Sequence, residues 1–241
     1  MIDSGFFMKQ IARIHTDFST KFGVPRQSGL INSLKAKIVF EPEYRNPDAL
    51  RGLKEFSHIW LIWEFSEAVR NTWSPTVRPP RLGGNKRMGI FATRSPFRPN
   101  PVGLSSVKLD WIELHTNLGP VLHVSGADMM DNTPIYDIKP YIAYTDSHPD
   151  ATGGFTDQYS CNKLEVNFPK HWLRLIPSER QEALICVLAL DPRPSYQNDP
   201  DRIYGFEFGG FEVKFTVQDT MLSVCKVESL KGTQSTPLEE K

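Results

Sequence analysis

The sequence predicts a mainly β protein, with a closed or partly closed barrel in its N-terminal part and a smaller α+β part after it. The 241 residues contain 19 prolines and 16 glycines, which favour many turns and argue against long helices over most of the chain. Short apolar segments of strand length recur between those turns, a pattern typical of barrels. Only one segment, near residue 178, has a clear helical pattern.

The expected strands of the N-terminal part are rich in apolar, aromatic and β-branched residues. The densest run covers residues 56–65 and is interpreted as a buried strand. Residues 107–114 and 121–124 are expected to form a hairpin, with Leu109 and Trp111 on the same face of its first strand. The other expected strands cover residues 9–14, 37–40, 88–92 and 137–142.

Two helices are expected between the strands. Asn46 suits the N-cap of a short helix, and Pro47 suits its first position. A longer helix opens at Ser178, where Ser178 and Gln181 match a capping box, and it ends before Pro192. The remaining expected strands cover residues 211–217 and 221–227.

A polar segment with Pro149 and a Gly-Gly pair covers residues 145–154 and is interpreted as a linker. We therefore expect a barrel over residues 1–148, a small α+β domain over residues 149–230 and a disordered tail over residues 231–241.

Charge is unevenly distributed along the chain. The 28 basic and 28 acidic side chains balance over the whole sequence. Residues 68–109 nevertheless contain no acidic residue, and their basic residues are Arg70, Arg78, Arg81, Lys86, Arg87, Arg94, Arg98 and Lys108. Such a basic segment indicates a surface for a polyanion such as nucleic acid. The alternatives are a chance fluctuation or pairing with the acidic C-terminal part.

Cysteine and histidine usage argues against disulfides and metals. Cys161, Cys186 and Cys225 lack the close spacing of a metal clip or redox pair, so we expect reduced, mostly buried thiols. The six histidines lack zinc spacing, and we expect no metal. No segment approaches the roughly 18 apolar residues of a membrane span, and we expect no signal peptide. A cytoplasmic location without membrane attachment follows as an expectation.

The densest candidate binding motif is RSPFRPNP, residues 94–101. Its prolines fix the backbone in advance, so little entropy is lost when a ligand binds. Arg94 and Arg98 present forked donors suited to carboxylate or phosphate, and Asn100 adds an amide that can read a base edge. The alternative is a rigid surface loop without a binding role.

Two other loops repeat parts of this chemistry. Residues 78–87 combine a Gly-Gly pair with flanking cations but lack the lysine–serine end of a P-loop. A nucleic-acid contact is therefore favoured over a nucleoside triphosphate site. Arg193 lies directly after Asp191 and Pro192 and is a second arginine whose backbone is fixed by proline. The alternative role of this segment is to end a helix and begin a linker. The loop at residues 25–27 is, by itself, most simply a solvated loop.

One acidic cluster is a candidate for acid–base chemistry. Residues 128–141 contain Asp128, Asp131 and Asp137 close to Lys139; their alternative role is to form turns. His58 lies in an apolar run, where a hydrogen-bonded core histidine is more common than a ligand. The sequence contains neither a G-x-S-x-G elbow nor a G-x-G-x-x-G fingerprint.

Together these segments resemble the bacterial TrmO-type enzymes, which N-methylate threonylcarbamoyladenosine beside the tRNA anticodon. The matching pieces occur in order at residues 21–27 (KFGVPRQ), 51–53 (RGL), 56–60 (FSHIW), 75–84 (PTVRPPRLGG), 91–101 (FATRSPFRPNP), 131–141 (DNTPIYDIKPY) and 191–194 (DPRP).

The resemblance implies a single-sheet β-barrel that holds S-adenosylmethionine, a C-terminal domain that helps to hold tRNA, and a homodimer with the cofactor near the subunit contact. It implies cofactor contacts from Pro25, Arg26, Gln27, His58, Ile59, Arg94, Leu104, Ser125, Gly126, Ala127 and Asp128. We expect tRNA contacts from Arg78, Arg81, Arg98, Asn100, Asp191 and Arg193.

Two positions depart from the family pattern. Asn132 replaces a common glycine in the Asp-Gly-Thr-Pro turn, and because asparagine tolerates a left-handed backbone, the turn should survive. Leu190 replaces a common glutamine, which puts one tRNA contact in doubt.

The chemistry expected of such an enzyme is direct methyl transfer, in which the protein mainly aligns donor and acceptor. The acceptor nitrogen is a poor nucleophile, so we predict that Asp137 and Lys139 assist the loss of its proton. The rival hypothesis is a non-catalytic RNA-binding barrel. A methyltransferase for a small molecule is disfavoured by the basic segment.

Overall fold

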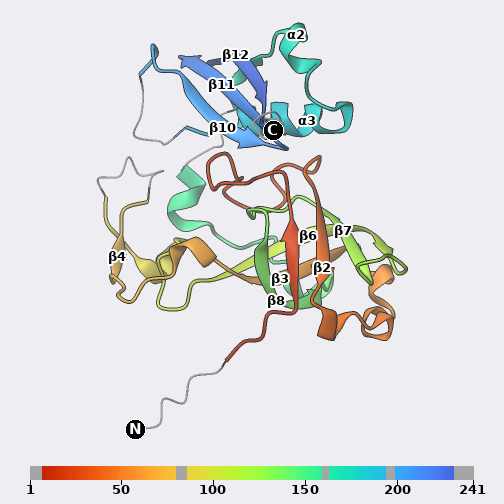
Figure 1. Ribbon diagram of the computed structural model, residues 1–241. Helices are drawn as coiled ribbons and strands as arrows, with labels where there is room; N and C mark the ends of the chain where they lie inside the picture. Colours follow the sequence, from red (N-terminus) through yellow and green to blue (C-terminus); the bar gives the residue numbers. More distant parts are fainter. Residues whose placement is uncertain (1–6, 80–85, 159–162, 194–198, 231–241) are drawn as a thin grey trace, which may run out of the picture.

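The computed structural model describes residues 7–79, 86–158, 163–193 and 199–230 (Figure 1). Arg81, Cys161 and the expected tail lie outside the described residues. The mainly β fold class is confirmed, because within the described part of the chain helices are few and strands form a barrel and a separate sheet.

Six strands close into an antiparallel barrel, in the order β1-β2-β7-β6-β3-β8, and pairing of β1 with β8 closes it. The strands are β1 (Ala12–His15), β2 (Lys35–Phe40), β3 (His58–Glu64), β6 (Val102–Glu113), β7 (Val121–Ser125) and β8 (Thr133–Pro140). A short ribbon of β4 (Thr76–Val77) and β5 (Met88–Gly89) lies in the connection between β3 and β6.

The barrel interior is filled by alternate side chains of each strand, as the pleat requires. On β3 the side chains of Ile59, Leu61 and Trp63 are buried. The intervening side chains of this strand are exposed or half-buried, so the predicted strand is present but is buried on one face only. The outward-facing side chains of Trp60 and Ile62 on β3 are half-buried and line a hollow.

A bulge in β6 changes the face on which Trp111 lies. The register with β7 shifts between Leu109 and Trp111. Leu109 is buried in the barrel, whereas Trp111 is exposed and stacks on His123 at a ring separation of 4.0 Å. The prediction that Leu109 and Trp111 share a face is therefore wrong, because a bulge residue reverses the alternation that follows it.

Short helices connect the strands. Asn46 caps the 3-10 helix Pro47–Leu50, accepting from the backbone N–H of Asp48 at 3.0 Å, as predicted. Asn132 adopts a φ of 62°, so the expected left-handed turn is confirmed. The other 3-10 helices are Pro42–Tyr44, Leu53–Glu55, Ser66–Ala68, Ile90–Ala92 and Gly154–Gln158, and α1 covers Ala143–Asp146.

The C-terminal part is a sheet with the helices α2 and α3 packed against it. Its strands follow the order β10-β11-β12-β9, with only β9 parallel to its neighbour. The elements are β9 (Glu165–Asn167), α2 (Lys170–Leu173), α3 (Ser178–Ala189), β10 (Tyr204–Phe208), β11 (Phe211–Gln218) and β12 (Met221–Ser229). The capping box is wrong: Pro177 is the N-cap of α3, and Gln181 instead donates to the carbonyl of Ile176 at 2.9 Å.

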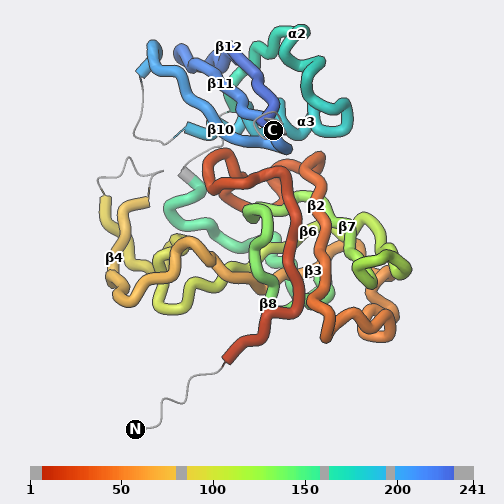
Figure 2. The backbone as a smooth tube through the Cα atoms, viewed as in Figure 1, coloured from red at the N-terminus to blue at the C-terminus, as the bar shows by residue number. Residues whose placement is uncertain are grey.

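The two parts of the chain share a hydrophobic core. Phe18, Ile31 and Leu34, from the loop between β1 and β2, are buried together with the apolar face of α3 and the inner face of its sheet. Asp17 fixes the same contact, with an ion pair to Arg180 at 3.0 Å. Figure 2 shows this loop, in red and orange, between the barrel and β10. The domain boundary at residue 148 stays a prediction.

The cysteines are only partly as expected. Cys186 and Cys225 are free thiols, but Cys225 is exposed rather than buried.

Candidate functional site

Three loops meet at the end of the barrel that faces the C-terminal sheet. Gly29 donates its backbone N–H to the carbonyl of Gly126 at 2.9 Å, and Gly126 donates in turn to Leu34 at 2.9 Å. A side chain at Gly126 would lie 3.3 Å from the backbone of Gly29, and its φ is 79°. Glycine therefore lets the loop after β7 approach the loop at residues 25–29 closely.

A polar network connects these two loops to the third loop, which begins at Arg94. Arg94 donates to the side-chain carbonyl of Gln27. Asp128 accepts from the hydroxyl of Ser105 at 2.6 Å, and this hydroxyl accepts from the indole N–H of Trp63 at 3.0 Å. Figure 1 shows the loop after β7 at the end of the barrel below β10. Forked donors and a carboxylate thus converge beside a small group of buried side chains.

Electrostatics at this end of the barrel are set mainly by burial. Burial raises the pKa of Asp128 above its ordinary 3.8, and hydrogen bonds from Ser105 and the backbone of Ser28 oppose this rise, as does the charge of Arg94. A carboxylate that is costly to keep charged, with a cation nearby, is typical of a binding or catalytic site.

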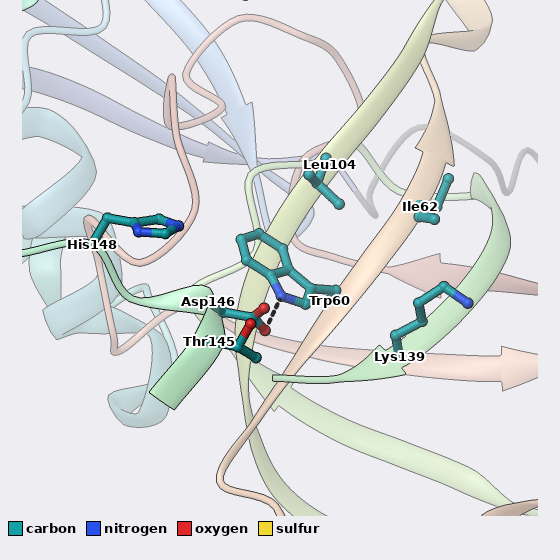
Figure 3. Close-up of a pocket in the computed structure, with 7 residues that line it drawn as sticks. All are labelled: Trp60, Ile62, Leu104, Lys139, Thr145, Asp146 and His148. Atoms are coloured by element: carbon teal, nitrogen blue, oxygen red, sulfur yellow. Dashed lines mark hydrogen bonds between the residues drawn. The ribbon is translucent and has the colours of Figure 1, made fainter. Parts of the chain in front are cut away.

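A second feature lies on the outer face of the barrel. An open hollow of about 340 Å³ is lined by Trp60, Ile62, Leu104, Lys139, Thr145, Asp146 and His148 (Figure 3). The indole N–H of Trp60 donates to Asp146 at 2.8 Å. The backbone N–H of Ile142 also donates to Asp146, and this bond is the main reason that the pKa of Asp146 is lowered. These contacts fix the ring of Trp60 as one wall.

The predicted catalytic pair lies beside this hollow. Lys139 Nζ and Asp137 Oδ2 are 2.9 Å apart on β8, and both side chains are exposed. The pKa of Lys139 is raised, because Asp137 accepts a hydrogen bond from it and stabilises its charge. Asp137 Oδ1 also accepts the backbone N–H of Ile138. Within the described residues, no hydrogen bond or ion pair joins Asp137 or Lys139 to Arg94 or Asp128.

The predicted cofactor residues separate into two groups. Gln27, Arg94, Gly126 and Asp128 belong to the barrel end, together with the neighbouring positions Pro25, Arg26 and Ala127. Leu104 instead lines the outer hollow.

The other three predicted cofactor residues differ from one another in their positions. His58 is exposed, with its ring 6.2 Å from that of Tyr141. The side chain of Ile59 is fully buried inside the barrel. The hydroxyl of Ser125, which is almost fully buried, bridges Lys35 and Asp110.

The predicted tRNA residues differ in how available they are. Arg78 and Asn100 are exposed. Arg98 donates to the carbonyl of Thr93 at 2.7 Å and so stabilises its own loop. Arg193 forms a two-pronged ion pair with Asp191, with distances of 2.8 and 2.9 Å. Because the Arg193 side chain is largely buried, this pair stabilises the end of α3, and its contact with tRNA stays a prediction.

Ser105 is a site residue that sequence reasoning missed. A signal was present, because Ser105 lies two residues before Val107 on an alternating strand and so must face the barrel interior. A buried hydroxyl needs a hydrogen-bond partner, and Asp128 supplies it. Trp60 and Asp146 were missed because nothing local connects positions so far apart in the chain.

Among the described residues, no group of histidine, cysteine and acidic side chains could hold a metal ion. No described helix has the length and apolar character to cross a membrane.

The barrel of six strands has a polar site at one end and a hollow on its outer face, and the basic segment of residues 68–109 lies largely in the connection between β3 and β6. These features are typical of a ligand-binding β-barrel. A family described as "tRNA-methyltransferase O N-terminal domain" matches residues 13–147, and one described as "TrmO C-terminal domain" matches residues 162–230. The chain belongs to the TrmO family.

Similar proteins agree with this assignment. The chain is 39% identical to the "tRNA (adenine(37)-N6)-methyltransferase" of Escherichia coli K12, over 93% of this chain and 99% of that protein. It is 43% identical to a protein of the same name from Eikenella corrodens, over 73% of this chain and 99% of that protein. A crystal structure of TrmO from Pseudomonas aeruginosa matches with a TM-score of 0.74 and 30% identity, over 93% of this chain and 97% of that chain.

A shorter relative matches part of this chain. A "Probable S-adenosyl-L-methionine-binding protein" of Methanothermobacter thermautotrophicus is 37% identical over 147 residues, which are 61% of this chain and 98% of that protein.

Proposed function

We propose that this chain transfers a methyl group from S-adenosylmethionine to the N6 nitrogen of adenosine 37 in tRNA. The observation that carries the proposal is the cluster of Gln27, Arg94 and Asp128 at the barrel end of a chain from the TrmO family. The names of its relatives supply the substrate and the position. The threonylcarbamoyl group on that adenosine is the finer part of the proposal and rests on the sequence resemblance alone.

The residues at the barrel end fit the methyl donor by their chemistry. S-adenosylmethionine supplies a methyl group that is already electrophilic. It also carries a carboxylate, an amino group and two ribose hydroxyls. Arg94 offers a forked donor for a carboxylate, and Asp128 offers an acceptor for hydroxyl or ammonium groups. A relative that matches 61% of this chain is named for binding this cofactor, which supports cofactor binding by this chain.

The raised pKa of Asp128 leads to a pH prediction. Below that pKa the carboxyl group is protonated and no longer attracts cationic or hydroxyl donors. We expect affinity for S-adenosylmethionine to fall as the pH decreases through a midpoint above 3.8. Calorimetric titration over a pH series checks this. Asp128→Asn should bind more weakly at neutral pH and lack this midpoint; an unchanged midpoint in the variant would assign the titration to another group.

Catalysis by this chain requires alignment of the acceptor nitrogen and help with its proton. The ion pair of Asp137 and Lys139 lies beside a hollow walled by Trp60, whose flat ring suits an aromatic base (Figure 3). We propose that the target base enters this hollow and that Asp137 accepts the proton while Lys139 holds the carboxylate in place. In this arrangement β6 contributes to both sites: its outward-facing Leu104 lines the hollow, and its inward-facing Ser105 donates to Asp128 at the barrel end.

The basic segment leads to a prediction about salt. If its arginines neutralise phosphates, tRNA affinity must fall steeply as salt rises, because counterions are released on binding. We expect a slope of about −3 for log affinity against log salt, equivalent to roughly four phosphate contacts at about 0.7 each. Arg78→Ala and Arg87→Ala should each make the slope shallower, whereas Lys9→Ala, outside the segment, should not. A flat response would remove the basic segment from tRNA binding.

The oligomeric state and the location are two further proposals. A homodimer is implied by the sequence resemblance, and light scattering of the purified chain tests it. A cytoplasmic location fits the proposed tRNA substrate.

The rival hypothesis of a non-catalytic RNA-binding barrel makes a different prediction. Such a protein would bind tRNA with the same salt dependence but would neither bind S-adenosylmethionine nor transfer its methyl group. Incubation of the chain with tRNA and S-adenosylmethionine labelled in its methyl group, followed by digestion to oligonucleotides and mass spectrometry of the fragment that contains position 37, separates the two. A labelled N6-methyl group at adenosine 37 is the expected result.

A further inference from the structure

The connection between β3 and β6 exposes an unusual amount of aromatic surface. Phe91 is 73% exposed, Trp73 52% and Phe97 39%. In Figure 2 this connection, gold to yellow, forms a lobe at the side of the barrel. Exposed apolar rings gathered on one surface indicate a binding partner more often than chance.

The rings are arranged with arginines rather than scattered. Trp73 and Phe91 have ring centroids 6.2 Å apart. The guanidinium group of Arg70 lies 3.8 Å from the centroid of Phe97, and that of Arg98 lies 5.8 Å from the centroid of Phe91. Flat faces bordered by fixed positive charge are complementary to nucleic-acid bases and their phosphates.

The loop that carries Phe91 and Phe97 is held by its own hydrogen bonds. The Thr93 hydroxyl donates to the carbonyl of Ile90 at 2.9 Å, and the backbone N–H of Phe97 donates to the Ser95 hydroxyl at 3.3 Å. Arg98 closes the loop by donating to the carbonyl of Thr93. The exposure of Phe97 is therefore built into an ordered loop, and little entropy would be lost when a base stacks there.

We propose that Trp73, Phe91 and Phe97 form a stacking platform for unpaired bases of the tRNA anticodon loop, and that Arg70, which lies over the ring of Phe97, attracts phosphate. The inference rests on the proposed tRNA substrate and assigns a surface to it. Arg94 lies between Phe91 and Phe97 in the chain and donates to Gln27. Phe91, Phe97 and Arg94 therefore belong to one loop, so bases stacked on its two rings keep the target nucleotide close to the proposed site of the methyl donor.

The first test measures binding of an anticodon stem-loop RNA with 2-aminopurine in its loop. Phe91→Ala and Phe97→Ala should each weaken affinity roughly 5- to 150-fold, the range for loss of one base stacked on an aromatic ring. Because no phosphate contact is lost, the dependence of affinity on salt should not change, whereas Arg70→Ala should make it shallower. Phe91→Trp should retain affinity.

Two controls separate stacking from damage to the fold. Phe7→Ala removes a ring that is more exposed, at 85%, in the chain before β1, and it should bind RNA like the parent. Calorimetric titration with S-adenosylmethionine reports whether the loop still holds Arg94 in place. The fluorescence of 2-aminopurine, which stacking changes, should respond to the parent protein and much less to the alanine variants.

The outcomes distinguish this inference from the proposed function. Alanine variants that bind the RNA and change its fluorescence like the parent would overturn the platform. If these variants also altered the oligomeric state, the rings would be a contact between copies of the chain instead. Variants that lose RNA affinity but retain cofactor binding support it. If the parent bound RNA through these rings but transferred no methyl group, the proposed function would fail and the platform would stand.

Discussion

Asp137→Asn is expected to lower the turnover number for methyl transfer by about 100-fold or more, the usual range for loss of a proton-transfer group. Asparagine has the same shape but cannot accept a proton. It also removes the partner that raises the pKa of Lys139. Affinity for tRNA should not weaken, since loss of a negative charge cannot repel a polyanion. Single-turnover rates with saturating tRNA and cofactor measure the effect without a contribution from product release.

A matched surface aspartate controls for the loss of charge. Asp48 is also exposed and paired with a cation, Arg51, but it lies in the 3-10 helix after β2. Asp48→Asn should turn over like the parent enzyme. Full turnover by Asp137→Asn with normal tRNA affinity would show that the proton leaves by another route. Lys139→Met then tests whether the cation at this position acts alone.

Arg94→Ala is expected to weaken binding of S-adenosylmethionine by about 10- to 150-fold. A hydrogen bond to a charged partner contributes about 1.5–3 kcal/mol, and each 1.4 kcal/mol is about tenfold in affinity. The side chain also holds Gln27, so its loss loosens the loop at residues 25–29. Calorimetric titration of the cofactor into the protein measures the change directly.

The control for Arg94→Ala comes from the same basic segment. Arg87 donates to the Thr76 hydroxyl at 3.2 Å on the ribbon of β4 and β5 and has no contact with the barrel-end cluster. Arg87→Ala should bind the cofactor normally and lose only part of the tRNA affinity. Arg94→Lys should bind with intermediate affinity, because lysine keeps the charge without the forked geometry. Normal cofactor binding by Arg94→Ala would move the cofactor site away from this end of the barrel.

Sequence alone was sufficient wherever short-range chemistry decides the outcome. The cap at Asn46 and the left-handed turn at Asn132 depend on one residue and its immediate backbone, and both are as predicted. The alternating strand at Phe211–Gln218 was predicted from its period, because alternation reflects burial of one face. The long motifs of the basic segment were distinctive enough to indicate the family.

Only the tertiary structure decided which of these residues meet. The bulge in β6 follows from pairing with β7 and moves Trp111 to the outer surface. Two hydrogen bonds join residues far apart in the chain: Ser105 donates to Asp128, and the indole N–H of Trp60 donates to Asp146. The division of the predicted cofactor residues between the barrel end and the outer hollow has the same origin. Closure of a barrel fixes the register of every strand together, and that register is a property of all six strands rather than of any single segment.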